Sequence, residues 1–259
     1  MKIDKGSALF ASLNNGGGEK IIPYIEKWLV TNPYAGIYEV DDRPYATKNP
    51  DRATMNFHPS GDCDKCERLL YFERDVETPV LDSPVDARLQ MIFKTGSVMH
   101  AMVQSWFAAM SGMDGFPELV ENEQRIEGGC FDGYGVGGYI DSVLRLPGVD
   151  GEIPIEIKTI NDHSFAVLNG PSKAHRLQIA CYIAFKESPF GIVLYINKNT
   201  CEMKEFKVEP MDLTNVLTRW SNVRRAVASG SPVGLAYGCK PGSREWERCP
   251  ARDVCFGRE

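Results

Sequence analysis

The segment GEIPIEIKTIND, residues 151–162, places a carboxylate and an amine two residues apart inside an apolar run. In a β-strand, Glu156 and Lys158 share one face, and the isoleucines between and before them share the other. The preceding segment GGYIDSVLRL carries Asp141, and the turn LPGVDGE predicts that the two segments pair as a hairpin. If Asp141 lies opposite Glu156 or Lys158, the three side chains converge, whereas a slip of one residue points Asp141 away. They form either an ion pair on a solvated face or a functional site.

A predicted long helix over residues 85–110 adds a histidine to these charged groups. Its apolar positions follow helical spacing and include His100 in their stripe: Leu89, Phe93, Gly96, His100, Val103 and Phe107. His100 is therefore expected to point inward. Gly96, one turn earlier, allows the helix backbone to approach the sheet closely. Taken alone, an inward histidine is as often a hydrogen-bonded core residue as a site residue.

A third predicted element, the helix SKAHRLQIACYIAFKE, follows the Glu-x-Lys strand. Gln178 and Tyr182 are spaced i, i+4 and therefore lie on one face of this helix. Both side chains need hydrogen-bond partners if they are buried. They could bond to backbone groups, or they could orient a lysine or a phosphate next to the carboxylate strand.

The remaining elements predict an α/β protein with a central mixed β-sheet flanked by helices. Strand-like alternation runs from residue 119 to residue 145, two further strands are predicted within GIVLYINKNTCEMKEFKVEP, and DLTNVLTRWSNVRRAVAS predicts a final helix. Residues 1–55 are expected to form a peripheral extension, with one helix interrupted by Pro23, and residues 56–259 to form the main domain. With 43% hydrophobic and 25% charged residues in 259, the chain can bury a sizeable core.

The four short motifs together resemble the RecB-like branch of the PD-(D/E)xK nuclease superfamily. The motifs are Gly96-x-x-x-His100, then Asp141, then Glu156-Ile157-Lys158, then Gln178-x-x-x-Tyr182, over roughly residues 60 to 257. The resemblance implies a restriction-endonuclease-like nuclease core. It also implies metal-dependent hydrolysis of DNA phosphodiester bonds.

The resemblance assigns roles that suit the chemistry of each residue. Asp141 and Glu156 would bind Mg²⁺ or Mn²⁺ through hard oxygen ligands, with His100 and the backbone carbonyl of Ile157 as further ligands. Lys158 would hold or help to deprotonate the attacking hydroxide and offset transition-state charge. Gln178 and Tyr182 would orient Lys158 or the DNA backbone.

The eight cysteines are poor candidates for disulfides in a chain that lacks secretory features. Five of them gather near the two ends of the main domain: Cys63, Cys66, Cys239, Cys249 and Cys255. The resemblance extends to these residues, because one subgroup of RecB-like nucleases ties its domain together with a 4Fe-4S cluster. It implies Cys66, Cys239, Cys249 and Cys255 as ligands, with Cys63 as a rival to Cys239. Four thiolates also suit zinc.

The sequence therefore predicts a DNA exonuclease of recombination, repair, CRISPR adaptation or phage DNA processing. Its DNA would have single-stranded character or free ends, and a helicase or a recombination or adaptation protein would be its partner. The net charge of −6 requires a local basic path for DNA, and the candidates for it include Lys173, Arg176, Arg219, Arg224 and Arg225. A noncatalytic DNA-binding subunit and a zinc-stapled binding module are the alternatives. The absence of a signal-peptide core or a membrane-length apolar run predicts a cytoplasmic protein.

Overall fold

The computed structural model describes residues 19–31, 56–75, 77–78, 87–126, 131 and 133–257. They fall into two compact units. The first unit is drawn from the ranges Met1–Asp42, Met91–Ile126 and Tyr139–Met211, and the second from Arg43–Gln90, Glu127–Gly138 and Asp212–Glu259. Each unit is therefore built from segments that are distant in sequence.

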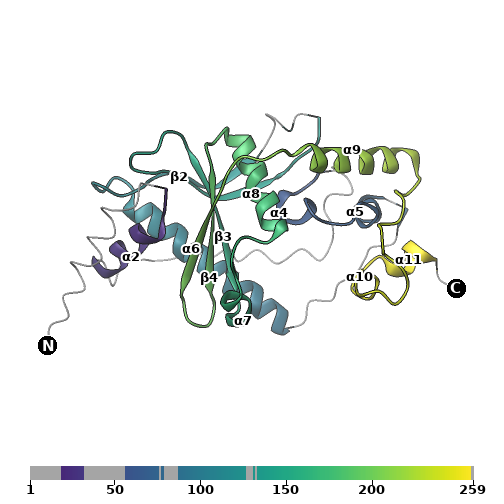
Figure 1. Cartoon of the computed structure of the whole chain (residues 1–259), viewed down its shortest axis with the longest axis horizontal. Helices are drawn as coiled ribbons and strands as arrows, with labels where there is room; N and C mark the ends of the chain where they lie inside the picture. The colour runs from purple at the N-terminus through teal and green to yellow at the C-terminus, as the bar shows by residue number, and fades with distance from the viewer. Residues whose placement is uncertain are drawn as a thin grey trace. The chain divides into compact units, whose positions relative to one another are not determined.

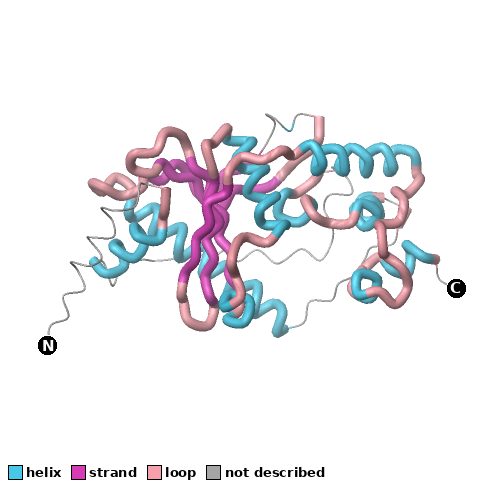
Figure 2. The backbone as a smooth tube through the Cα atoms, viewed as in Figure 1, coloured by secondary structure: helices cyan, strands magenta, loops and turns pink. Residues whose placement is uncertain are grey.

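The first unit is organised around a five-stranded mixed sheet, which confirms the predicted fold class (Figures 1 and 2). The strands lie side by side in chain order: β1 (Glu118–Ile126), β2 (Gly138–Arg145), β3 (Ile153–Ile160), β4 (Gly191–Asn197) and β5 (Met203–Val208). β2 and β3 pair antiparallel, β3 and β4 parallel, and β4 and β5 antiparallel. The parallel pair requires a long crossover between β3 and β4, which contains two helices.

Helices cover both faces of this sheet. The α2 (Ile22–Thr31) and α6 (Ala87–Met110) helices pack buried side chains such as Trp28 and Phe107 against Ile155 and Ile157 of β3. The crossover holds α7 (Asp162–Ala166) and α8 (Lys173–Lys186), and α8 contacts β3 and β4. A Cβ on Gly191 would lie 2.7 Å from the Ile179 side chain, so a glycine is needed for α8 to pack this closely.

The second unit is built from helices. It contains α4 (Pro59–Asp62), α5 (Glu67–Arg74), α9 (Thr214–Ser229), α10 (Arg244–Glu247) and α11 (Arg252–Phe256). α5 packs against α9, and a small core forms from Tyr71, Phe72, Ala226 and Ala251. The cysteines near the two ends of the predicted domain belong to this unit.

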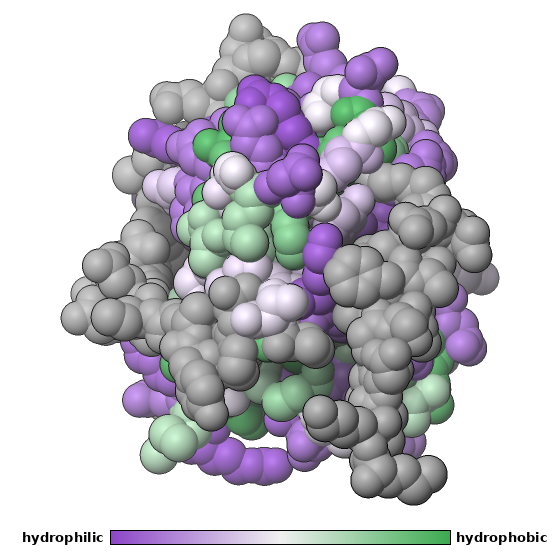
Figure 3. Space-filling view, turned by 90° about the vertical axis from the view of Figure 1, so that its left-hand side faces the viewer, coloured by the Kyte–Doolittle hydropathy of each residue, from purple (hydrophilic) through white to green (hydrophobic). Residues whose placement is uncertain are grey.

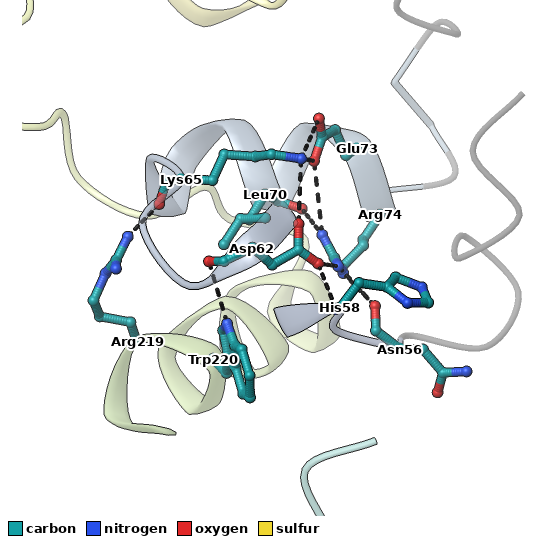
Figure 4. Close-up of polar contacts among 9 residues, drawn as sticks. All are labelled: Asn56, His58, Asp62, Lys65, Leu70, Glu73, Arg74, Arg219 and Trp220. Carbon is teal, nitrogen blue, oxygen red and sulfur yellow. Dashed lines mark hydrogen bonds and ion pairs between the residues drawn. The ribbon is translucent and has the colours of Figure 1, made fainter. Parts of the chain in front are cut away.

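A buried ionic network holds the chain between α4 and α5 (Figure 4). Asp62 lies 2.5 Å from Arg74 and 3.2 Å from Lys65, and it also accepts a hydrogen bond from the backbone N–H of His58. Lys65 in turn lies 3.0 Å from Glu73. Arg219 of α9 donates to the backbone carbonyls of Cys63 and Lys65 on the same segment. The segment that carries Cys66 is therefore fixed on two sides.

Several details differ from the sequence-based expectations. Pro23 does not interrupt the first helix, because α2 begins at Ile22 and a proline is tolerated in a first turn. The alternating stretch from residue 119 to residue 145 is two strands, and α7, α10 and α11 were not predicted. Ile21 and Ile25 are fully buried in the core of the first unit. The boundary at residue 55 stays a prediction, because residues 1–18 and 32–55 lie outside the described residues.

The described surface is mostly polar. Figure 3 looks onto one face, where the visible hydrophobic side chains are interspersed with hydrophilic ones. Within the described ranges, no helix combines the length and the apolar character needed to cross a membrane.

Candidate active site

The sequence left the register between β2 and β3 open, and the structure has the register that continues to Asp141 and Glu156. Their ladder pairs Leu144 with Ile153 and Ser142 with Ile155, so Asp141 and Glu156 are the next residues along. At this point Oδ2 of Asp141 accepts a hydrogen bond of 2.6 Å from the backbone N–H of Ile157. The Asp141 side chain is therefore hydrogen-bonded to a backbone N–H group of β3 just beyond the ladder. This bond anchors the Asp141 carboxylate on the strand of the Glu-x-Lys motif.

Glu156 and Lys158 form an ion pair on this strand. Lys158 Nζ lies 2.5 Å from Glu156 Oε1, and the Glu156 side chain is only 2% exposed. Burial raises the pKa of Glu156 to about 8, and the nearby Asp141 carboxylate adds to the increase. Burial also raises the pKa of Asp141 to about 7. Burial alone would lower the pKa of Lys158, but the charges of the two carboxylates outweigh it and raise that pKa. The lysine is therefore held as a cation.

His100 reaches this group from α6. Its Nδ1 lies 3.6 Å from Oδ2 of Asp141. Burial lowers the pKa of His100, so the imidazole is neutral at neutral pH. A Cβ on Gly96 would lie 3.3 Å from Oγ1 of Thr159, as expected for a glycine that allows α6 to approach β3. A neutral imidazole can accept a proton or coordinate a cation.

Gln178 and Tyr182 are both buried on α8, and Nε2 of Gln178 donates a 2.9 Å hydrogen bond to the hydroxyl of Tyr182. Burial raises the pKa of Tyr182 well above its usual value, and the charge of Glu156 contributes. Oε1 of Gln178 and Oε2 of Glu156 are buried and have no hydrogen-bond partner in the described part of the chain. Buried oxygens without partners are rare in folded proteins and suggest a site for a ligand.

These two unpaired oxygens allow us to ask whether the site fits a metal ion. Asp141 and Glu156 supply hard carboxylate oxygens next to a neutral imidazole, a donor set that suits Mg²⁺ or Mn²⁺. Among the described residues, however, no group of three or more His, Cys, Asp or Glu side chains is arranged to hold a metal ion as it stands. The donor chemistry fits a cation, and the roles of Asp141, Glu156, His100 and the Ile157 carbonyl as ligands stay predictions.

Four further residues around this site were not predicted. Gln104 of α6 donates to Oε1 of Glu123 and to the backbone carbonyl of Asp141, both at 2.7 Å. Tyr195 of β4 is the register partner of Lys158, and its hydroxyl lies 2.7 Å from Nδ1 of His175. Helical spacing from His100 and Gln178 could have identified Gln104 and His175. No such pattern identifies Tyr195 or Glu123. The strand register places Tyr195, and the local backbone conformation places Glu123.

The four predicted cluster ligands, Cys66, Cys239, Cys249 and Cys255, all belong to the second unit, where the described residues likewise include no group of three or more such side chains arranged to hold a metal ion. Burial raises the pKa of the Cys239 thiol, and negative charge on Cys255 and Cys66 raises it further. Cys249 behaves in the same way, with burial first and then the charges of Cys255, Cys66 and Cys239. The Cys63 side chain is separately buried, with 1% exposure. In addition, Nε of Arg68 donates to Sγ of Cys255 over 3.1 Å.

Some basic residues that the sequence suggested as a DNA path are engaged within the protein. Arg219 donates to two backbone carbonyls and pairs with Glu67 at 3.3 Å. Arg224 donates to the carbonyl of Gly133, and Arg225 to the side chain of Asn222. Arg219 is therefore primarily a structural residue. Lys173 and Arg176, at the start of α8, are exposed.

The first unit is thus an α/β structure whose mixed sheet carries two carboxylates, a lysine and a histidine, of which Glu156 is buried and the other three are half-buried. No protein-family model matches the sequence, and no curated protein is similar to it at a significant level. Solved structures to which this chain is similar include SSO0001, at 16% identity and a TM-score of 0.43, with 90% of this chain and 93% of that chain covered.

Another similar structure is an alkaline exonuclease, LHK-Exo, from Laribacter hongkongensis. This chain is 12% identical to it, with a TM-score of 0.47 and coverage of 79% of this chain and 93% of that chain. LHK-Exo in complex with dAMP gives 14% identity and a TM-score of 0.48, with coverage of 69% and 91%. Similarities at this level do not assign a function, so a function has to be inferred from the site.

Proposed function

We propose that this chain is a metal-dependent DNA nuclease, and more narrowly an exonuclease of the RecB-like type. Its setting would be recombination, repair, CRISPR adaptation or phage DNA processing. The observation that supports this proposal most directly is the convergence of Asp141, Glu156, Lys158 and His100 at one point of the sheet. Two carboxylates beside a lysine can hold a cation and neutralise phosphate charge at the same place.

Mg²⁺ or Mn²⁺ is the proposed cofactor of this site. Asp141 and Glu156 would hold it, with His100 and the carbonyl of Ile157 as additional ligands. Once bound, the cation would supply Lewis-acid stabilisation of the phosphate and would lower the pKa of an attacking water. It would also remove the penalty for two adjacent ionised carboxylates, whose pKa values of about 7 and 8 otherwise favour protonation.

Lys158 is proposed to act as a fixed positive charge rather than as a base. Because its pKa is raised, Nζ keeps its proton near neutral pH and can donate to a phosphate oxygen as negative charge develops there. Tyr182 and Gln178 belong to α8, which contacts β3, and the charge of Glu156 contributes to the raised pKa of Tyr182. We assign them to the orientation of the Glu156 and Lys158 side chains.

A 4Fe-4S cluster is proposed for the second unit, with zinc as the alternative metal. Cys66, Cys239, Cys249 and Cys255 would be the ligands, as the resemblance implies, and all four belong to this unit. Cys239 is preferred to Cys63, whose side chain is buried and whose carbonyl accepts from Arg219. The cluster would be structural, since α10 and α11 are only four and five residues long.

The proposed substrate is DNA with free ends or single-stranded character, supplied by a helicase or by a recombination or adaptation partner. The experiment is digestion of end-labelled single- and double-stranded DNA, with a closed circle as control, in Mn²⁺, Mg²⁺ or EDTA. Wild-type protein should release label only with metal. Lys158→Ala and Glu156→Ala should each lower the rate by about 100-fold or more. Lys207→Ala, a lysine of β5 paired with Glu19 and Glu209, should retain activity.

The outcomes separate the proposed activities. Cleavage of linear DNA with intact circles supports an exonuclease, and cleavage of circles indicates an endonuclease. If wild type leaves every substrate intact but binds DNA, the chain is a noncatalytic binding subunit and the nuclease proposal is wrong.

A further inference from the structure

His175 and Tyr195 lie next to the proposed site, and the proposed function leaves them without a role. Tyr195 is the register partner of Lys158 on the neighbouring parallel strand, so the two side chains leave the sheet on the same face. His175, Gln178 and Tyr182 are spaced i, i+3 and i+7 on α8 and share one face of that helix. The polar side chains on this face of α8 therefore run from the buried Tyr182 and Gln178 to the half-buried His175.

The hydrogen bonds of Tyr195 determine which nitrogen of His175 carries the proton. The Tyr195 hydroxyl oxygen accepts from the backbone N–H of Ser172 at 3.3 Å, and it lies 2.7 Å from Nδ1 of His175. A phenol has one proton to donate, and Nδ1 is its hydrogen-bond partner here. We assign this proton to the bond with Nδ1, so that the neutral imidazole carries its own proton on Nε2.

This orientation is imposed by a rigid support. Tyr195 is 1% exposed, and its ring packs edge-on against Phe206 at 5.8 Å between centroids. The ring of His175 is tilted against the ring of Tyr195 at 5.6 Å, while His175 itself is only half-buried. The buried Tyr195 thus fixes the orientation of the partly exposed His175. Burial together with the charge of Lys158 lowers the pKa of His175 to about 4, so the imidazole remains a neutral donor.

The surroundings of this donor favour an anion. Lys158 is linked to His175 through Tyr195, which is the register partner of Lys158 and contacts His175 through its hydroxyl, and His175 lies in the first turn of α8, a helix of 14 residues. The partial positive charge of a helix N-terminus and a lysine both attract phosphate. An N–H donor in that field is suited to a phosphate oxygen.

We propose that His175 binds, through Nε2–H, the phosphate adjacent to the one that Lys158 contacts, and that Tyr195 is the positioning residue for His175. This inference rests on the proposed function, since it concerns the same DNA strand. The proposed contact lies beyond the metal site and is made to the DNA backbone. It therefore holds the strand without contributing sequence specificity. Its contribution should appear in DNA binding and KM rather than in kcat.

The test compares four variants for DNA affinity in EDTA, by fluorescence anisotropy, and for KM and kcat with metal. Loss of one hydrogen bond to a charged group should weaken binding by about 10-fold in His175→Ala and in Tyr195→Phe. His175→Gln should restore most of the affinity, because its amide can place an N–H near the position of Nε2. Tyr24→Phe, a tyrosine of α2, should match wild type.

A neutral methylphosphonate placed at the adjacent phosphate identifies the ligand atom. It should weaken wild-type binding by about 10-fold and should add no further loss in His175→Ala. Additive losses, or a His175→Ala variant that binds like wild type, would overturn the assignment even if Lys158→Ala abolishes cleavage. DNA binding that depends on His175 in a protein without cleavage would support the contact and refute the nuclease. A protein that does not bind DNA would overturn both proposals.

Discussion

At the scale of single residues, two buried carboxylates differ in how completely they are paired. Both oxygens of Asp62 have partners, namely Arg74, Lys65 and the N–H of His58. Glu156 has Lys158 at one oxygen and no hydrogen-bond partner among the described residues at the other. A satisfied buried ion pair is structural, whereas a carboxylate with an unsatisfied oxygen is poised to bind a ligand. The two groups should therefore respond differently to mutation.

Replacement of Arg74 should test the structural group. Its side chain is 1% exposed, donates to Asp62 and to the carbonyl of Asn56, and lies 4.3 Å from the Phe57 ring centroid. Arg74→Ala leaves a buried carboxylate without its main partner and should lower the free energy of unfolding by about 3–5 kcal/mol. Urea denaturation of both proteins measures this. Lys65→Ala, at a side chain that is 29% exposed, should cost about 1 kcal/mol or less.

The difference in the free energy of unfolding between wild type and Arg74→Ala should depend on pH, which gives a second check. Burial alone would raise the pKa of Asp62, but the charges of Arg74 and Lys65 outweigh it and lower the pKa below 3.8. A lowered carboxyl pKa contributes stability above the unfolded value and loses it as the pH falls through the folded value. The gap between wild type and Arg74→Ala should therefore narrow below about pH 4. A gap that stays constant in acid, or no gap at all, would contradict the assigned role of this pair.

At the scale of elements, the motif residues were predictable because each lies on a strongly patterned helix or strand. Asp141 lies close to Glu156 because a short turn joins β2 and β3 and restricts their register. The pairing of Lys158 with Tyr195 was not predictable, since a crossover of two helices separates these strands and leaves their register open. α10 and α11 were missed because they are too short to show a helical period.

The backbone conformation at Glu187, where α8 ends, leads to a prediction about the stability of the protein. Glu187 ends α8 with φ of 51°, a left-handed conformation that glycine adopts without strain, and it is exposed. Glu187→Gly should raise the free energy of unfolding by about 0.5–1 kcal/mol. Arg176→Gly, at an exposed position inside the same helix, should lower it by about 1 kcal/mol. Both changes are measured by chemical denaturation.

Glu123 serves as a matched comparison, because it also has a positive φ, of 53°, within β1. Its carboxylate accepts from Gln104, which also donates to the carbonyl of Asp141. Glu123→Gly would relieve the backbone but lose this bond, so its net gain should be smaller than that of Glu187→Gly. If Glu187→Gly destabilised the protein as much as Arg176→Gly, the assigned conformation at the end of α8 would be wrong.

At the scale of the whole molecule, the two units carry different chemistry. The residues of the candidate active site belong to the first unit, and Cys66, Cys239, Cys249 and Cys255 belong to the second. The first unit has an extensive core of buried side chains on one face of its sheet. Among the described residues, the cysteine-bearing tail of the second unit packs in a small cluster whose buried members are Tyr71, Phe72, Ala226 and Ala251. A metal group would supply the stability that this small core lacks.

Removal of that metal should accordingly loosen the second unit and spare the first. Protein purified without oxygen should contain iron and sulfide, and Cys255→Ser should lose both, whereas Cys63→Ser should keep them. Hydrogen exchange followed by mass spectrometry should then show faster exchange in α10 and α11 of Cys255→Ser, with β3 and β4 unchanged, because the sheet core needs no metal to hold it. Zinc without sulfide would assign the site to zinc. If no metal is present and exchange in the tail does not change, the cysteines do not form a metal site, and the stability of the tail must come from contacts such as the bond between Arg68 and Cys255.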